Sequence, residues 1–479
     1  MWSVLLAMMT AAGAGEATDT RFSQQRLREV EAFVVREAEQ ARIPGFALAV
    51  STKTGVLLAV GHGASNPEGT PITANTPLQI GSLTKSFTAL ATLQLAEAGK
   101  LDLDAPVEQY LPEFRSGTDG NAQRITVRHL LNQTSGLSAL DGFGGSSRSE
   151  RVAELLSMAG TRPEHPPGQR FQYSNANYEL LGLVVEQVSG TSYPEFIRRS
   201  IFEPLGMTNT YADAWAAAQK GELAWGHQNW FGINHRTRGY LSPPVLSAGG
   251  ICSSASDMGR YLAAHLNDGE FNGVRLAGSD RFGELHHPPG DFSSYAMGWS
   301  VRKVGEHSVL LHNGSTPHFT ATMLVAPDAG VGIVVLTNTN VFNLPFVELH
   351  TRRIATGALR TLLGETVPAV GAKHVWGELF TKLLLLLGLV GSVLALFRQI
   401  RRWRKAPESW TKFTVGFLLD LAVVGLLLWG VPQLFGIPIR SLVEYVPDVG
   451  AMLILGLALA FARLAMRAAF AWRGRPNRM

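Results

Sequence analysis

The chain has 479 residues, of which 46% are hydrophobic, and a formal net charge of +4 at pH 7. This length accommodates one large catalytic domain and a further unit. The positive charge gathers near the C-terminus, around long apolar runs, so it does not indicate nucleic-acid binding. Cys252 is the only cysteine, which excludes an internal disulfide, and we expect it to be a buried packing residue.

The first residues have the features of an export signal. Residues 2–9 form a short apolar stretch that ends near the small residues Ala12-Gly13-Ala14. Although a basic start is missing, we predict a cleavable signal peptide over residues 1–14. The catalytic domain is expected over residues 20–362.

The elements that follow predict a mixed fold. A helix is expected over residues 22–41, and two strands, 46–50 and 56–60, are joined by a turn at Lys53-Thr54-Gly55. A helical middle part comes next. It precedes antiparallel strands at 297–304, 308–311, 320–326 and 331–336 and a last helix at 346–363. This order is typical of an α+β fold, an antiparallel sheet flanked by helices with a helical subdomain.

A Ser-x-x-Lys motif, Ser82 to Lys85, opens an apolar run with helical spacing that stops at Gly99. Ser82 is therefore expected at a helix start, where backbone N–H groups and the helix dipole favour a developing negative charge. Lys85 lies three residues on and shares its face. The same spacing at Ser300 and Ser409 lacks this context, because the first lies in an expected strand and the second in a basic loop.

Two further motifs follow in order, Tyr173-Ser174-Asn175 and His312-Asn313-Gly314. A serine hydroxyl is a weak nucleophile at neutral pH, so it needs a base, an acid for the leaving group and an oxyanion site. Lysine and tyrosine fill the first two roles without a His-Asp pair. We predict that Ser82 is the nucleophile and that Lys85, kept partly neutral by burial and neighbouring positive charge, takes its proton either directly or in concert with Tyr173.

The order of these motifs resembles the serine hydrolase superfamily of class C β-lactamases, D-alanyl-D-alanine carboxypeptidases and related esterases and peptidases. The resemblance covers residues 25–360 and is carried by further segments as well. These are residues 125–137 (ITVRHLLNQTSGL), 167–171 (PGQRF), 204–207 (PLGM), 248–250 (AGG) and 295–299 (YAMGW). It implies the sheet and helical subdomain of that superfamily and a catalytic centre of Ser82, Lys85 and Tyr173.

The resemblance also assigns roles to other residues. Tyr173 passes a proton to the departing group and later helps to activate water. Asn175 hydrogen-bonds Lys85 and the substrate amide, while the backbone N–H groups of Ser82 and Ser315 form the oxyanion hole. For Tyr173, the alternative is an aromatic wall of the cleft.

The third motif departs from the Lys-Thr-Gly of true β-lactamases. His312 is expected to polarise the Tyr173 oxygen as a catalytic residue, but it is charged only below its pKa, so a substrate carboxylate is bound less well. Asn313 presents an amide next to it, which we interpret as a reader of a polar group on the substrate. The alternative is a strand residue that faces solvent.

We expect neither a metal nor another cofactor. The acyl-enzyme chemistry needs none, and the histidines outside the motifs lack convincing ligand spacing. We interpret them as surface or cleft residues; they include His227, His235, His286 and His287.

Three apolar runs, 383–397, 413–434 and 449–462, predict three transmembrane helices within residues 375–468, followed by a basic tail at 469–479. Buried core helices are the alternative, which the lack of a polar face disfavours. Asp420 lies inside the second run, where a charge is costly. We expect it to pair with a neighbouring helix or to line a polar path.

Basic residues crowd two segments. One is the connection between the first and second apolar runs, and the other is the C-terminal tail. By the positive-inside rule these segments are cytoplasmic, which places the catalytic domain on the periplasmic side of a bacterial inner membrane. The bilayer is then a partner. Self-association or a transporter contact through the helices is a further expectation.

An exported hydrolase domain with three C-terminal spans resembles the membrane-bound peptidases that mature natural products, such as the colibactin-maturation peptidase. The resemblance implies a prodrug-activating D-amino-acid peptidase that cleaves amide bonds of a small-molecule or peptide substrate through an acyl-enzyme. Three alternatives stay open. They are a cell-wall D-alanyl-D-alanine carboxypeptidase or esterase, a β-lactamase, and a penicillin-sensor module.

Overall fold

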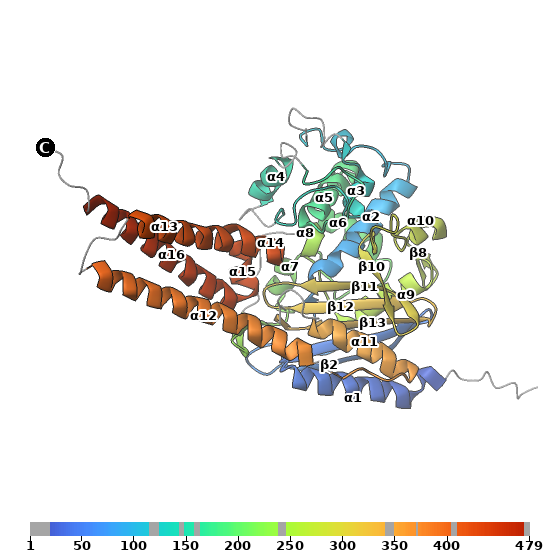
Figure 1. Ribbon diagram of the computed structural model, residues 1–479. Coiled ribbons are helices and arrows are strands. Elements are labelled where there is room, and N and C mark those ends of the chain that lie inside the picture. The colour runs from blue at the N-terminus through green and yellow to red at the C-terminus, as the bar shows by residue number, and fades with distance from the viewer. Residues whose placement is uncertain are drawn as a thin grey trace, which may run out of the picture.

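The computed structural model describes residues 20–114, 124–142, 148–157, 163–237, 246–340, 349–369, 372–403 and 410–473. A catalytic domain built on a sheet is followed by a bundle of long helices that extends away from it (Figure 1). The predicted signal peptide, residues 1–14, lies outside the described residues. So do Ser409 and the last six residues of the predicted basic tail.

The central sheet has seven antiparallel strands in the order β2-β1-β13-β12-β11-β10-β9. The N-terminal hairpin therefore pairs with a late strand, Phe46 opposite Thr337. The strands are β1 (Gly45–Thr52), β2 (Gly55–Gly63), β9 (Tyr295–Ala296), β10 (Trp299–Val304), β11 (His307–Ser315), β12 (Thr320–Ala326) and β13 (Val331–Thr337). The predicted α+β class is confirmed. The strand predicted at 308–311 is longer, because β11 continues through the third motif.

Each face of the sheet packs against its own helices. In β1, alternate side chains point to opposite faces: Phe46, Leu48 and Val50 pack toward α1 (Gln24–Gln40) and α11 (His350–Leu363). The intervening Ala47 and Ala49 join the larger core on the other face, with α2 (Thr84–Glu97), α5 (Asn175–Ser189) and α9 (Ala255–Leu266). The core on this second face surrounds the start of α2.

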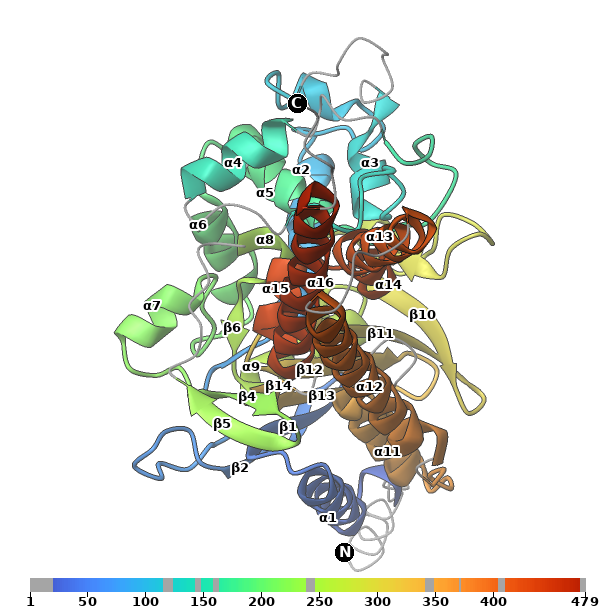
Figure 2. The ribbon, with the colours of Figure 1, turned by 60° about the vertical axis from the view of Figure 1, so that its left-hand side comes forward.

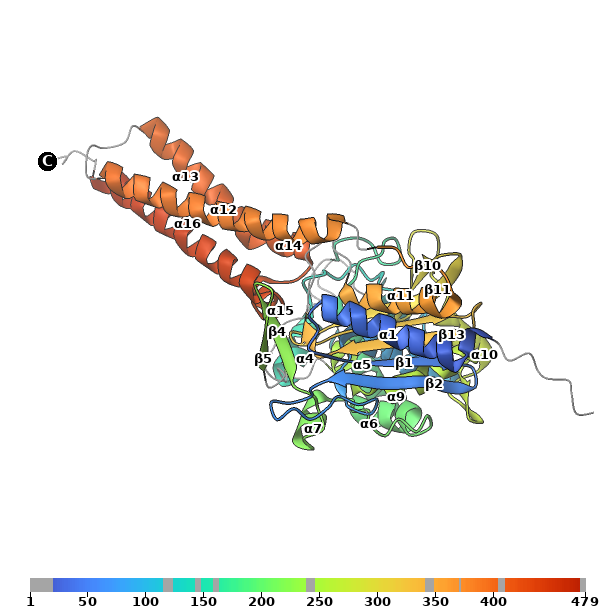
Figure 3. The same cartoon turned by 90° about the horizontal axis from the view of Figure 1, so that it is seen from below.

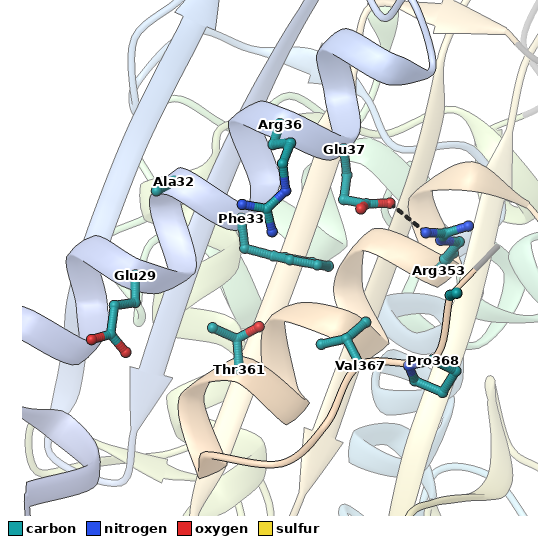
Figure 4. A pocket seen from close by; sticks show the side chains of 10 residues that line it. Glu29, Ala32, Phe33, Arg36, Glu37, Arg353, Thr361, Val367 and Pro368 are labelled. Carbon is teal, nitrogen blue, oxygen red and sulfur yellow. Dashed lines mark ion pairs between the residues drawn. The ribbon is translucent and has the colours of Figure 1, made fainter.

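A cavity of about 450 Å³ opens between α1 and α11 (Figure 4). Phe33 lies under the guanidinium of Arg36, at 5.5 Å from the ring centre. Glu37 forms an ion pair with Arg353 at 2.8 Å. Because both helices pack on the sheet face opposite to α2, this cavity is separate from Ser82.

The remaining elements of the catalytic domain are short. Figure 2 shows α3 to α6 grouped beside α2, as the predicted helical subdomain. The helices are α3 (Val127–Leu131), α4 (Arg148–Ser157), α6 (Tyr193–Ile197), α7 (Ala214–Gln219), α8 (Leu246–Gly249) and α10 (Ser279–Glu284). The strands are β3 (Leu78–Gln79), β4 (Gly226–Trp230), β5 (Ile233–Thr237), β6 (Cys252–Ser253), β7 (Glu270–Phe271), β8 (Val274–Arg275) and β14 (Thr339–Asn340). Cys252 is fully buried in β6, as expected.

Within the described residues, three helical stretches are long and apolar enough to cross a membrane: Lys382–Arg401, Thr411–Phe435 and Pro447–Ala469. They belong to α12 (Ala372–Trp403), to α13 (Trp410–Gly425) with its continuation through a π-turn (Leu426–Gly430) into α14 (Val431–Phe435), and to α16 (Pro447–Arg473). The short α15 (Ile439–Tyr445) precedes α16. These helices agree with the predicted C-terminal runs and indicate membrane anchoring.

The charged residue in the second stretch is paired. Asp420 is 6% exposed, and its carboxylate contacts Arg463 at 2.7 Å and Arg467 at 2.8 Å, both on α16. The expected pairing with a neighbouring helix is therefore present. One carboxylate contacts two guanidinium groups, so these ion pairs join α13 to α16.

Candidate active site

Ser82 lies in a tight 3-10 turn, η2 (Gly81–Leu83), that leads directly into α2. The sequence-based placement at a helix start is correct to within two residues. Gly81 makes this turn possible, because its φ of +52° is a left-handed conformation that favours glycine. A Cβ at Gly81 would also lie 2.7 Å from the backbone nitrogen of Ser315, so the glycine allows η2 to approach β11 closely.

Lys85 is fully buried and is held by three acceptors. Its Nζ donates to Ser82 Oγ at 3.0 Å, to Asn175 Oδ1 at 2.8 Å and to the backbone carbonyl of Ala248 at 2.8 Å. The same nitrogen lies 4.9 Å from the ring centre of Tyr173. The geometry therefore brings the predicted nucleophile, base, amide and tyrosine together around one lysine nitrogen.

The charge state of Lys85 is balanced by its surroundings. Burial lowers its pKa from 10.5 to about 7, and the negative charge of Glu179 opposes this shift. The expectation of a partly neutral lysine agrees with this pKa, but its second cause was wrong: the neighbouring charge that acts on Lys85 is a carboxylate. A lysine with a pKa near 7 can accept a proton at neutral pH.

Tyr173 and Asn175 are positioned by the start of α5. Asn175 is the first residue of that helix, and Ser174 precedes it in extended conformation. The backbone N–H of Ser174 donates to the side chain of Gln133 at 2.9 Å, and Gln133 itself has a φ of +58°. A left-handed glutamine is strained, and such strain is typical of functional sites. Gln133 therefore fixes the backbone between the tyrosine and the asparagine.

The hydroxyl of Tyr173 is kept protonated. Burial raises its pKa, and a hydrogen bond with Ser82 opposes part of that increase. A protonated tyrosine in contact with the nucleophile is suited to deliver its proton to a leaving group. The contact also lets it relay a proton between Ser82 and a departing amine.

His312 is almost fully buried on β11. Its Nδ1 lies 2.8 Å from the carbonyl oxygen of Asn313, which can only accept, so Nδ1 carries the proton. Its Nε2 then accepts the hydroxyl of Tyr295 at 3.2 Å. The ring centres of His312 and Tyr173 are 6.3 Å apart, and both rings pack near Tyr295.

Burial and the positive charge of Lys85 lower the pKa of His312 to about 3. The side chain is therefore neutral at physiological pH. It does not supply the positive charge that lysine supplies at this position in true β-lactamases. This agrees with the expectation that a substrate carboxylate is bound less well.

Ser315 ends β11 beside Gly81, the residue before Ser82, and its part in an oxyanion hole stays a prediction. Gly314 makes this approach possible, because a Cβ there would lie 1.9 Å from the backbone oxygen of Ile80. Ser300 pairs with Leu311 in the sheet, so β10 covers β11 only up to Leu311. Beyond that point the backbone of β11 is not paired with β10.

Asn313 is not where the sequence predicted it. Side chains alternate along β11, so Asn313 points to the face opposite to that of His312. Its amide oxygen accepts the hydroxyl of Thr322 at 2.9 Å, and the same Thr322 oxygen lies 3.0 Å from the hydroxyl of Thr351 on α11, from which it can accept. The interpretation as a reader of the substrate is therefore corrected: Asn313 joins the sheet to α11.

The other candidate residues have structural surroundings. Lys53-Thr54-Gly55 forms the turn between β1 and β2, as predicted. His286 is hydrogen-bonded to the buried His265 at 2.9 Å. His227 is hydrogen-bonded to the backbone of Asn338, whereas His235 and His287 are exposed. In the described ranges no group of three or more His, Cys, Asp or Glu side chains is arranged to hold a metal ion.

Three residues around the site were missed in the sequence. Glu179 modulates Lys85, the backbone of Ala248 binds Lys85, and Tyr295 binds His312. Glu179 had a detectable signal, because it lies four residues after Asn175 and thus on the same helix face. Ala248 and Tyr295 lie in segments that carried the family resemblance, but nothing local in either segment indicates its partner.

The chain is similar in sequence to known bacterial proteins. Protein flp of Staphylococcus aureus (strain N315) is 28% identical over 347 residues, which cover 69% of this chain and 67% of that protein. Penicillin-binding protein 4* of Bacillus subtilis (strain 168) is 28% identical over 298 residues, covering 57% of this chain and 63% of its own length.

Solved structures show that the fold is also shared. The octameric penicillin-binding protein homologue from Pyrococcus abyssi aligns with a TM-score of 0.61 and 28% identity over 71% of this chain and 78% of its own. A class C beta-lactamase aligns with a TM-score of 0.59 over 72% of this chain and 98% of its own, at 22% identity. Residues 30–358 match the family described as Beta-lactamase. The chain therefore belongs to the beta-lactamase family, a group of serine hydrolases that includes penicillin-binding protein relatives.

Proposed function

We propose that the protein is a membrane-anchored serine hydrolase that cleaves acylated D-amino-acid amides through an acyl-enzyme on Ser82. The observation that carries this proposal is the position of Lys85, which donates to Ser82 at 3.0 Å and has a pKa of about 7. At neutral pH a large fraction of this lysine is uncharged. It can then take the Ser82 proton as the hydroxyl attacks a carbonyl carbon.

The remaining steps use groups that surround Ser82. The backbone N–H groups of Ser82 and Ser315 are suited to stabilise the negative oxygen of the tetrahedral intermediate. Tyr173 then protonates the departing amine, and the acyl group stays on Ser82. The Tyr173 oxygen, now deprotonated, takes a proton from a water molecule as that water attacks the ester carbonyl. Lys85 returns its proton to the Ser82 oxygen as the ester bond breaks, which releases the acid and restores the serine.

The choice of substrate follows from His312. A side chain that is neutral at pH 7 gives little attraction to a carboxylate, whereas β-lactams and peptides ending in D-alanine carry one close to the scissile bond. A substrate that carries an amide in place of this carboxylate needs no positive charge at position 312. The D configuration is carried over from the resemblance to D-alanyl-D-alanine carboxypeptidases, and a precursor of an acylated natural product is a substrate of this class.

Location is part of the proposal. The three apolar stretches and the basic residues beside them support a catalytic domain outside the cytoplasmic membrane, with the C-terminus inside. Protease treatment of spheroplasts should then cleave within residues 20–360. Protection of that range would contradict the orientation.

The nucleophile is tested with a fluorophosphonate probe on the purified full-length protein. The wild type and Ser300→Ala should be labelled covalently, whereas Ser82→Ala should not. Ser300 is the matched control, because it has the same Ser-x-x-Lys spacing but lies in β10. Labelling of Ser82→Ala at the wild-type rate would exclude Ser82 as the nucleophile.

The substrate class is tested with matched pairs. N-acyl-D-alanyl-D-alaninamide should be cleaved faster than N-acyl-D-alanyl-D-alanine, whose leaving group carries a carboxylate, and faster than the corresponding L-amide. Rapid hydrolysis of nitrocefin without turnover of the amides would instead favour a β-lactamase. Acylation by a β-lactam that is not followed by hydrolysis of either compound would favour a penicillin sensor.

A further inference from the structure

The hairpin of β4 and β5 carries large apolar side chains at its tip, which we call the aromatic tip (residues 230–233). Phe231 is 61% exposed and Ile233 is 62% exposed, and Trp230, the last residue of β4, is 37% exposed. Adjacent exposed apolar side chains of this size indicate a contact surface. The tip takes no part in the catalytic geometry described above.

Phenylalanine is an unusual residue for the backbone conformation at position 231. Trp230 pairs with Ile233, so Phe231 and Gly232 form a two-residue turn. Both have positive φ, +48° and +83°, as a type I′ turn requires. Asparagine or glycine is favoured at the first position, and an aromatic ring there is strained. An aromatic residue at this strained position suggests that the exposed ring itself has a role.

The position of the tip is set by contacts with the helical bundle. The backbone N–H of Phe231 donates to Asp448 Oδ2 at 3.2 Å, and Lys382 Nζ contacts the same oxygen at 3.0 Å. Asp448 is the second residue of the stretch Pro447–Ala469, and Lys382 is the first residue of the stretch Lys382–Arg401. One carboxylate therefore joins the ends of two apolar spans to the tip of the hairpin.

A second contact strengthens this placement. The side chain of Gln228 on β4 donates to the backbone oxygen of Glu444, at the end of α15, at 2.7 Å. Figure 3 shows β4 and β5 beside α15, at the end of the bundle that meets the catalytic domain. Because an apolar span begins where the hydrocarbon core begins, the tip lies at the level of the membrane–water interface.

We propose that the aromatic tip inserts into the interface of the phospholipid bilayer next to the bundle. Tryptophan and other amphipathic rings are enriched at this depth of membranes. The exposed Arg236 on β5 follows the tip, where lipid phosphates would neutralise it. The hairpin is then a further membrane contact of the catalytic domain, besides the three spans, and this inference does not depend on the proposed substrate.

The contact has a direct structural connection to the active site. β4 pairs in parallel with β14, so that His227 lies opposite Thr339 and Gln228 opposite Asn340. The side chain of Asn340 is 3.5 Å from Ser315 Oγ. A hairpin held by lipid would thus fix the orientation of β11, which ends at Ser315, relative to the membrane surface.

The test is site-specific fluorescence quenching in lipid nanodiscs with the full-length protein. Cys252 is buried, and in a Cys252→Ser background Phe231→Cys is labelled with an environment-sensitive dye. Arg275→Cys is the matched control, because its side chain is also exposed and β8 lies at the far end of the catalytic domain from the bundle (Figure 1). Nanodiscs contain phosphatidylglycerol and phosphatidylethanolamine, with or without lipids that bear a doxyl quencher near the headgroup.

The dye at position 231 should emit at shorter wavelength than the dye at position 275 and should be quenched several-fold more strongly. Ile233→Cys gives a second labelling site if Phe231→Cys does not fold. Equal quenching at the tip and at position 275, or a tip emission equal to that in water, would overturn the proposal. In a second variant, Phe231→Asn suits the turn but removes the ring, so it should reduce quenching of a dye at position 233.

Discussion

Glu179 and Lys85 meet at the backbone of a single residue, Ala248. The N–H of Ala248 donates to Glu179 Oε1 at 3.2 Å, and its carbonyl accepts Lys85 Nζ at 2.8 Å. The carboxylate thus holds in place the carbonyl that binds the lysine. It also raises the lysine pKa against the effect of burial. Glu179 is therefore a positioning residue that sets the pH range of the proposed base.

The first prediction concerns pH. If neutral Lys85 is the base, kcat/KM should rise as pH increases through about 7, where the lysine loses its proton. Glu179→Gln removes the charge that raises this pKa, so the ascending limb should move to lower pH. The glutamine oxygen can still accept from Ala248, which preserves the geometry. Initial rates from pH 5 to 9 measure the limb, and a shift to higher pH would contradict this assignment.

The second prediction concerns the acid. Tyr173→Phe keeps the ring beside Lys85 but removes the hydroxyl, so it should lower kcat/KM on amides by about 10², the scale of a proton-transfer role. An activated ester needs no protonation of its leaving group, so the loss in its acylation should be smaller. Stopped-flow acylation rates with both substrates measure the difference. An equal loss on both would make Tyr173 a structural residue.

The third prediction concerns the approach of β11 to the nucleophile. Gly314→Ala places a Cβ within 1.9 Å of the backbone of Ile80, so the strand must move and Ser315 must leave its position. We expect a loss in kcat of about 10² or more, the scale for removing an oxyanion donor. Gly283→Ala in α10 is the control, because its Cβ would meet open space. Circular dichroism separates lost activity from lost folding, and full activity in a folded Gly314→Ala would refute the argument.

The fourth prediction concerns the bundle. Asp420→Asn removes the carboxylate that contacts both Arg463, which is 6% exposed, and Arg467, and we expect it to destabilise the bundle by about 3 kcal/mol. Replacing Asp420 and Arg463 together by Met and Leu should cost less than the single change, because it removes the buried charge along with its partner. Thermal unfolding in detergent measures both. A more severe effect in the double variant would show that the pair is needed for more than neutralisation.

The sequence predicted what local pattern determines. Ser82 was placed correctly because a helix start can be recognised from neighbouring residues, and Asn175 because the motif order matched a known arrangement. Asn313 was wrong because the strand was expected to end at residue 311, and its alternation therefore was not applied to the third motif. The roles of Ala248 and Tyr295 depend on contacts between distant segments, for which neither residue gives a local signal.

The burial that makes Lys85 a base also links folding to proton release. In the unfolded chain a lysine has a pKa of 10.5, whereas in the folded domain that of Lys85 is about 7. Between these values the unfolded chain binds more protons, so the free energy of unfolding increases with pH, by up to about 5 kcal/mol in total from this one residue. Below pH 7 Lys85 is protonated in the folded domain as well, so the folded state bears the full free-energy cost of a buried ammonium group. The catalytic domain should therefore be least tolerant of further destabilising mutations under the same acidic conditions in which the proposed base is protonated.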